Sequence, residues 1–190
     1  MRKADGAGLE SVVQQNRVCM GDSDGDRALS DAKAAAGHQP HTLISGGQTG
    51  VDRAALDWAI DNQLSHGGWC PKGRKAEDGP LHPRYQLQET TQIAYPIRTR
   101  LNVESADATL IIYRPPMGSG TGLTVRIISE VGRPSMKFEL DEDDPGRIQA
   151  FLDRHQPGIL NIAGPRESGC PGIYAATMKL FDEVFGKTSP

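Results

Sequence analysis

The chain has 190 residues, of which 37% are hydrophobic and 24% are charged, and its formal net charge is −3. A chain of this length predicts one domain. The acidic balance and the lack of a long Lys/Arg run argue against nucleic acid as a partner, because proteins that bind it carry basic surfaces. No apolar run approaches the roughly 20 residues that span a bilayer, and the N-terminus lacks the apolar centre of a signal peptide. We therefore expect a cytoplasmic protein with no membrane partner.

The cysteines point to the same compartment. Cys19, Cys70 and Cys170 are odd in number and have no C-x-x-C spacing. Neither a disulfide framework nor a zinc site is therefore predicted, and a reducing compartment fits best. We expect no dedicated metal site in this chain.

The first forty residues differ in composition from the rest. Residues 1–40 are rich in Asp, Gly, Ser, Gln and Ala and show no sustained apolar period of 2 or 3.6 residues. The hexamer at 18–23 has the pattern of a strand followed by a Gly turn, but one such match is frequent by chance. We interpret 1–40 as a disordered N-terminal extension and 41–187 as the folded domain.

From His41 onward, short apolar runs alternate with amphipathic segments. This pattern is typical of β-α-β units. Strands are predicted over 42–45, 68–71, 109–113, 135–140 and 159–163, and helices over 51–63, 99–105, 123–131, 145–155 and 171–184. The expected fold is a Rossmann-like, three-layer α/β domain with a mostly parallel sheet of about five strands and helices on both faces.

Two glycine-rich segments follow predicted strands directly. In open α/β sheets, ligands bind where such loops meet helix N-termini, and an anion is attracted by unpaired N–H groups and the helix dipole. The alternative is that each segment is only a tight turn, but two in one sheet favour phosphate binding. The candidate residues are Gly46, Gly47, Gln48, Thr49 and Gly50 in the first, and Gly118, Ser119, Gly120 and Thr121 in the second. We expect their strands to be neighbours, so that both helices point into one crevice.

Neither segment matches a known nucleotide motif of the common kinds. No Lys-Ser or Lys-Thr pair follows the glycines, and no G-x-G-x-x-G with a downstream acid is present. Walker-type ATPases and NAD dehydrogenases are therefore disfavoured.

Charged residues near these segments complete the candidate site. Asp52 and Arg53 open the first helix, where Asp52 either complements the helix dipole or binds sugar hydroxyls or Mg²⁺. Lys72 lies with Arg74 and Lys75 in a loop that either clamps phosphate or is simply solvated. The segment Arg166, Glu167 and Ser168 directly precedes the last helix, at the edge of the sheet where binding residues concentrate.

Four segments together resemble the molybdenum-cofactor carrier family. These segments are Ile44–Asp57, Gly68–Gly79, Ser105–Leu110 and Asn161–Ser168. The resemblance covers about 42–185, and it implies a Rossmann-like fold related to the lysine-decarboxylase-like group of cytokinin-activating phosphoribohydrolases. It also implies binding of molybdenum cofactor, a pterin with a phosphate tail, or of a nucleotide such as ATP, in a homo-oligomer.

One departure from the related enzymes bears on catalysis. The phosphoribohydrolases carry a Gly-Gly-x-Gly-Thr-x-x-Glu motif, and this chain has Thr124 where the glutamate stands. Loss of that carboxylate puts N-glycosidic hydrolysis in doubt, because such chemistry needs a positioned acid or base. We therefore expect a non-catalytic carrier or storage protein for a phosphate-bearing small molecule. The alternative is a nucleotide or nucleoside-monophosphate hydrolase that uses Asp52 or Glu167 as base, with Mg²⁺.

The composition of the N-terminal extension generates a first prediction. A chain that begins near Gln39 is expected to fold, because the residues before it lack the apolar periodicity needed to join a core. Its melting temperature and solubility, measured against the full chain, test this. A loss of several degrees would mean instead that 18–20 form an additional strand and that the domain begins earlier.

Overall fold

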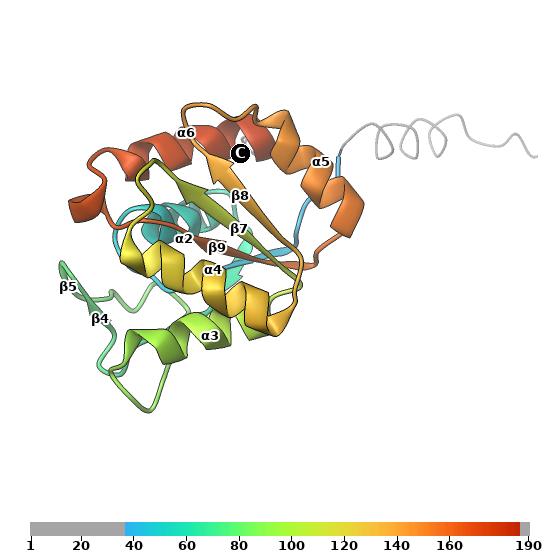
Figure 1. Ribbon diagram of the computed structural model, residues 1–190. Coiled ribbons are helices and arrows are strands. Elements are labelled where there is room, and N and C mark those ends of the chain that lie inside the picture. The colour runs from blue at the N-terminus through green and yellow to red at the C-terminus, as the bar shows by residue number, and fades with distance from the viewer. Residues whose placement is uncertain (1–36, 187–190) are drawn as a thin grey trace, which may run out of the picture. The chain divides into compact units, whose positions relative to one another are not determined.

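A parallel five-stranded sheet forms the centre of the domain. The computed structural model describes residues 37–186 (Figure 1). The strand order is β2-β1-β9-β7-β8, and every neighbouring pair is parallel. The strands are β1 (Thr42–Ile44), β2 (Ser65–Gly67), β7 (Ala108–Tyr113), β8 (Ser135–Glu139) and β9 (Ile159–Ala163).

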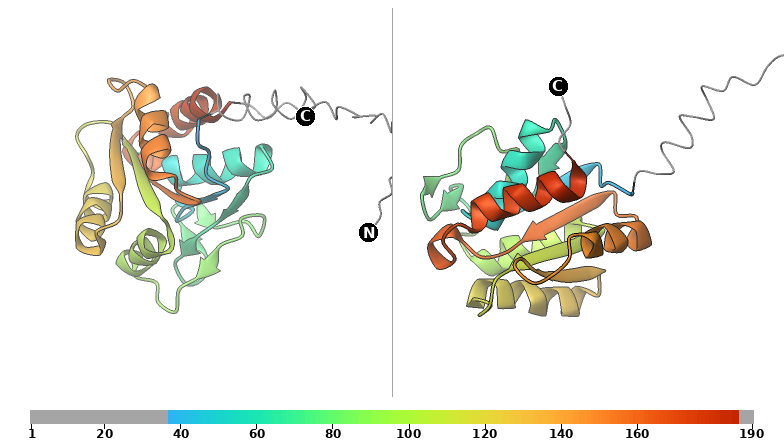
Figure 2. Two further views of the ribbon diagram at one scale, coloured as in Figure 1. Left: turned by 90° about the vertical axis from the view of Figure 1, so that its right-hand side faces the viewer. Right: turned by 90° about the horizontal axis from the view of Figure 1, so that it is seen from above.

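Helices cover both faces of this sheet, as the two views of Figure 2 show. One face carries α2 (Val51–Asp61), α5 (Gly146–His155) and α6 (Ile173–Phe185), and the other carries α3 (Tyr95–Ser105) and α4 (Ser119–Val131). Each layer has its own apolar cluster against the sheet. The predicted three-layer Rossmann-like fold is confirmed.

The central strand β7 shows why the sequence selects this arrangement. Its first five residues are buried. Leu110 and Ile112 pack into the cluster beneath α2, α5 and α6, and Ile111 between them packs against α3 and α4. Because side chains alternate across a strand, a strand covered on both faces is mainly apolar, and the one buried polar side chain of β7, Thr109, accepts a hydrogen bond from Asn161.

The described part of the chain begins slightly before the predicted domain. The His38 backbone N–H donates to Asp153 at 2.7 Å, and the Gln39 amide donates to the Phe185 carbonyl at 2.9 Å. Pro40 is buried. The rest of the predicted extension, 1–36, lies outside the described residues. Within the described residues, no helix combines the length and the apolar character needed to cross a membrane.

The predicted strand at 68–71 is wrong in its placement. The second strand of the main sheet is Ser65–Gly67, whose polar sequence gave no strand signal. Gly68, with φ of +121°, turns the chain out of the sheet, so that β3 (Trp69–Cys70) pairs with β6 (Gln88–Glu89) instead. The polar loop between them contains a hairpin of β4 (Lys75–Ala76) and β5 (Gly79–Pro80).

Two further expectations need correction. The strand β9 lies between β1 and β7, so the two strands that precede the glycine-rich segments are not neighbours. The second segment is not a loop, because α4 begins at Ser119 and Gly118 is its N-cap. In addition, α3 begins at Tyr95, before the predicted 99, and Pro96 supplies its first turn.

A buried carboxylate holds the loop after β3 against the helices. Asp57 on α2 accepts hydrogen bonds from the Tyr85 hydroxyl at 2.7 Å, the Tyr174 hydroxyl at 2.9 Å and Arg84 at 2.5 Å. Burial, together with the hydrogen bond to Asp57, raises the pKa of Tyr174 to about 12. The loop, α2 and α6 thus meet at one side chain.

This cluster generates a stability prediction. Asp57→Ala leaves two tyrosine hydroxyls without their acceptor, and it is expected to lower the free energy of unfolding by about 1–3 kcal/mol. Urea unfolding of the variant measures the change. The exposed Asp61→Ala on the same helix is the control, expected to stay within about 0.5 kcal/mol of wild type. Equal stability of both variants would show that Asp57 does not hold the loop.

Candidate functional site

A cavity of about 500 Å³ opens at the carboxyl ends of the central strands. Gly46 follows β1, Arg114 follows β7 and Gly164 follows β9, and all three line it. Residues of α3 and the first turn of α4 complete the wall. Its size and its position at the carboxyl edge of a parallel sheet are typical of small-molecule sites.

Nine of the fifteen residues predicted for the site line this cavity. They are Gly46, Gln48, Asp52, Gly118, Ser119, Gly120, Thr121, Arg166 and Ser168. Six do not belong to its lining, namely Gly47, Thr49, Gly50, Arg53, Lys72 and Glu167.

The glycines of the first segment pack closely against other residues of the protein. A Cβ on Gly46 would lie 1.5 Å from Nη1 of Arg98, so this glycine makes room for that guanidinium. Gly50 has φ of +78°, and a Cβ there would lie 2.4 Å from the Pro165 carbonyl oxygen. Gly47, with φ of +72°, faces Leu81 and Leu87. This segment is therefore a close-packed turn, and of its three glycines only Gly46 lines the cavity.

The glycines at the start of α4 are different. A Cβ on Gly118 or Gly120 would meet no atom within 4 Å. No side chain caps α4, and the first N–H groups of a helix have no partner within it. The first turn of this 13-residue helix thus offers backbone donors and the positive end of its dipole to the cavity.

A buried ion pair forms the opposite end of the cavity. Nη1 of Arg98, from α3, lies 3.1 Å from the Asp52 carboxylate, and the two side chains are only 15% and 7% exposed. Burial raises the pKa of Asp52, while the charge and hydrogen bond of Arg98 and the Gln48 backbone N–H act in the opposite direction. Asp52 therefore balances the charge of Arg98 inside the protein.

Two side chains at this end have donors without a protein acceptor. Among the described residues, the buried side-chain atoms without a hydrogen-bond partner include Nε2 of Gln48 and Nε of Arg98. Gln48 is 4% exposed, and its Oε1 accepts from the backbone N–H groups of Thr49 and Glu77, at 3.1 and 2.9 Å. This fixes the carboxamide and identifies Nε2 as its free donor. Buried polar groups are nearly always paired, so these two donors are expected to meet an acceptor from outside the protein, either water or a ligand.

Glu77 joins the first segment to the loop after β9. It accepts hydrogen bonds from the Thr49 hydroxyl and, at 2.5 Å, from the Ser168 hydroxyl. Desolvation raises the pKa of Glu77, but the hydrogen bonds from Ser168 and Thr49 lower it, so that the pKa of this carboxyl lies below its usual value. Both hydroxyls are therefore engaged by the protein itself.

Arg53 and Glu167 also have structural partners. Arg53 donates to the Gly47 carbonyl at 3.2 Å and pairs with Asp78 at 3.1 Å. The Glu167 carboxylate accepts from the backbone N–H groups of Gly172 at 2.5 Å and Tyr174 at 3.0 Å, at the start of α6. The two residues considered as bases for a hydrolase, Glu167 and Asp52, therefore both have partners in the described structure, because Asp52 pairs with Arg98.

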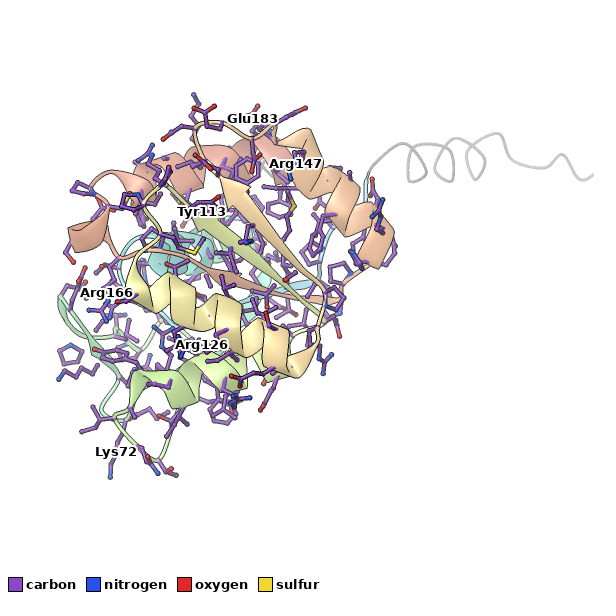
Figure 3. The ribbon with its side chains drawn as sticks, viewed as in Figure 1. Lys72, Tyr113, Arg126, Arg147, Arg166 and Glu183 are labelled. Atoms are coloured by element: carbon purple, nitrogen blue, oxygen red, sulfur yellow. The ribbon has the colours of Figure 1, made fainter. Side chains whose placement is uncertain are left out.

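Arginines provide the charge of the cavity. Arg166 lies with its guanidinium carbon 5.1 Å from the ring centroid of Tyr95, and Arg114 pairs with Asp141 at 2.6 Å. Three arginines and one aspartate line the cavity, and its lining contains no lysine, glutamate or histidine. Figure 3 shows Lys72 at the lower edge of the molecule, well away from Arg166.

Sequence analysis missed part of the lining. Arg114 and Asn161 sit at a strand end and within β9, where a search of strand ends would find them. Arg98 comes from α3, and no spacing or motif in the sequence of this helix indicates that it contacts the first glycine-rich segment. The other missed polar residues are Tyr95, Thr99 and Asn102.

Within residues 37–186, no group of three or more His, Cys, Asp or Glu side chains could hold a metal ion. The Mg²⁺ suggested for the hydrolase alternative thus gains no support from a cluster of such side chains in the described part of the chain.

The fold and cavity define a Rossmann-like domain with a ligand site at the carboxyl edge of its sheet. Residues 43–185 match the model of the circularly permutated YpsA family of the SLOG group, and the chain belongs to this family. It is 42% identical to a crystal structure, at 1.45 Å resolution, of a protein from Syntrophus aciditrophicus SB that is provisionally described as a molybdenum carrier. The two superpose with a TM-score of 0.76, over 80% of this chain and 98% of the other. No protein of the curated set matches significantly.

These relatives bear out the resemblance found from the sequence. The segments from Ile44 to Ser168 that carried it lie inside the matched range. Membership in this family establishes the fold, and the residues that line the cavity indicate which chemical groups a ligand could contact.

The contrast between the two glycine segments generates a prediction. Gly46→Ala places a methyl group where the Arg98 guanidinium lies, so that side chain must shift away from its contact with Asp52, and the variant is expected to lose about 0.5–3 kcal/mol of folding free energy. Gly120→Ala meets no atom and is expected to be neutral or to stabilise α4 by up to about 1 kcal/mol.

Denaturant unfolding of both variants provides the test. If Gly46→Ala is as stable as Gly120→Ala, then Gly46 is not a packing position and the first segment is free to approach a ligand.

Proposed function

We propose that this protein binds a phosphate-bearing small molecule in the cavity and acts as a carrier or storage protein. Molybdenum cofactor or a nucleotide is the expected ligand. The observation that carries the proposal is the first turn of α4, where Gly118 and Gly120 leave backbone N–H groups open to the cavity. A helix N-terminus of this kind is suited to a phosphate group.

The charges of the lining support an anionic ligand. Arg98 is balanced by Asp52 and Arg114 by Asp141, but Arg166 adds positive charge, and the dipole of α4 adds to it. The hydroxyls of Ser119 and Thr121 supply further donors at the same end. An anion bound there would be surrounded by donors from β7, β9 and α4.

The name of the Syntrophus relative favours molybdenum cofactor among phosphate-bearing ligands. That cofactor would place its phosphate at the start of α4 and its pterin along the cavity, and it is the cargo rather than a resident group. The hydrolase alternative is less favoured, because the one carboxylate in the cavity lining, Asp52, is paired with Arg98.

Replacement of Gly120 tests the anion site. Gly120→Asp puts a carboxylate into the space that the phosphate needs, and binding is expected to be lost. The fold should survive, since an acidic residue in a first helical turn stabilises by about 0.3–1 kcal/mol. Thr121→Ala keeps the backbone donors and is expected to weaken binding by about 0.5–1.5 kcal/mol.

Calorimetric titration with inorganic phosphate, nucleoside monophosphates and released molybdenum cofactor measures these effects. Ser129→Ala, on the exposed side of α4, is the matched control. Wild-type affinity in a folded Gly120→Asp protein would place the anion elsewhere. Phosphate or base release from the nucleotides at steady state would favour the hydrolase.

A further inference from the structure

The cavity has a second polar end that the phosphate does not occupy. Gln48 and Arg98 belong to the loop after β1 and to α3, whereas the first turn of α4 follows β7. The strand β9 lies between β1 and β7. Since adjacent strands are about 4.8 Å apart, the strands β1 and β7 that precede the two ends are separated by roughly 10 Å. A ligand that reaches both ends must therefore carry a second polar group remote from its phosphate.

The second end offers hydrogen-bond donors in a fixed position. Nε2 of Gln48 and Nε of Arg98 are buried and have no acceptor among the described residues. The Gln48 backbone N–H, at 3.4 Å, and Nη1 of Arg98, at 3.1 Å, both reach Oδ2 of Asp52, so the two residues meet at one carboxylate. Both residues also line the cavity, so their unpaired donors lie beside the ligand group that would enter this end.

Charge decides which acceptor fits there. The Asp52 carboxylate balances Arg98, and a second anion beside it would be repelled. A neutral oxygen acceptor satisfies the donors without that repulsion. An amino group would leave them unpaired and oppose donor to donor.

The wall between the two ends suits a flat ring. Pro115, Pro116 and Leu123 line it on the side of β7 and α4, with Ala163 from the end of β9 and Pro165 from the loop that follows. In Figure 1, α3 and α4 run side by side over one face of the sheet, and residues of both helices line the cavity.

We propose that the ligand is a phosphate ester of an oxo-heterocycle, and that Gln48 and Arg98 bind its ring carbonyl oxygen. Hypoxanthine and guanine nucleotides and 4-oxopterin cofactors share this group, whereas adenine carries an amino group in its place. Gln48 and Arg98 are thus specificity-determining residues. This inference rests on the proposed function, because it takes the phosphate at α4 as the other anchor.

The matched ligands IMP and AMP test it, because they differ in an oxo against an amino group at one ring position. IMP is expected to bind about tenfold more tightly than AMP to the full chain in calorimetric titration. Gln48→Glu keeps the Oε1 acceptor for Thr49 and Glu77 but removes the amide donor, and it is expected to abolish the preference. Arg98→Lys keeps a cation for Asp52 without Nε and should reduce the preference as well.

The controls separate the two ends of the cavity. Affinity for inorganic phosphate should be lost in Gly120→Asp and unchanged in Ser129→Ala, which should behave as wild type throughout. Equal affinity for IMP and AMP in the wild-type protein, or an unchanged preference in both variants, would overturn this inference and leave the proposed function standing. If neither nucleotide binds, the inference fails, and if phosphate and molybdenum cofactor also fail to bind, the proposed function fails with it.

Discussion

The ion pair between Arg98 and Asp52 connects parts of the chain that are distant in sequence. Arg98 extends from α3 into the space left by the missing side chain of Gly46, and there it reaches the start of α2. Removal of either partner would leave an unpaired charge at less than one-sixth exposure, which costs several kcal/mol. The close packing at Gly46, the hydrogen bond from the Gln48 backbone N–H to Asp52 and one end of the cavity depend on this contact.

This constraint gives the two glycine segments different roles. Gly46 and Gly50 are glycines because protein atoms occupy the positions of their side chains, and Gly118 and Gly120 are glycines with open space beside them. A glycine-rich sequence alone does not distinguish these cases, because both need a residue without a side chain. The same residue type thus holds the architecture at one end of the cavity and leaves backbone donors accessible at the other.

The cavity as a whole is suited to binding more than to catalysis. Its single carboxylate is neutralised by an arginine, and Glu167 is committed to the N-terminus of α6. The remaining polar groups are mainly donors, which hold an acceptor-rich ligand without supplying a free base. Membership in the family and the molybdenum-carrier description of the Syntrophus protein are consistent with this character.

Local patterns in the sequence determined the fold class and the edge of the sheet at which ligands are expected. The apolar run of β7 and the periodicity of α2, α4 and α6 are strong signals, because burial on one or two faces demands them. Only the tertiary structure decided that β9 separates β1 from β7, that β2 is the polar segment Ser65–Gly67, and that Arg98 enters the site from α3. Strand order and contacts between distant residues depend on how the layers pack together, which no local spacing of residues records.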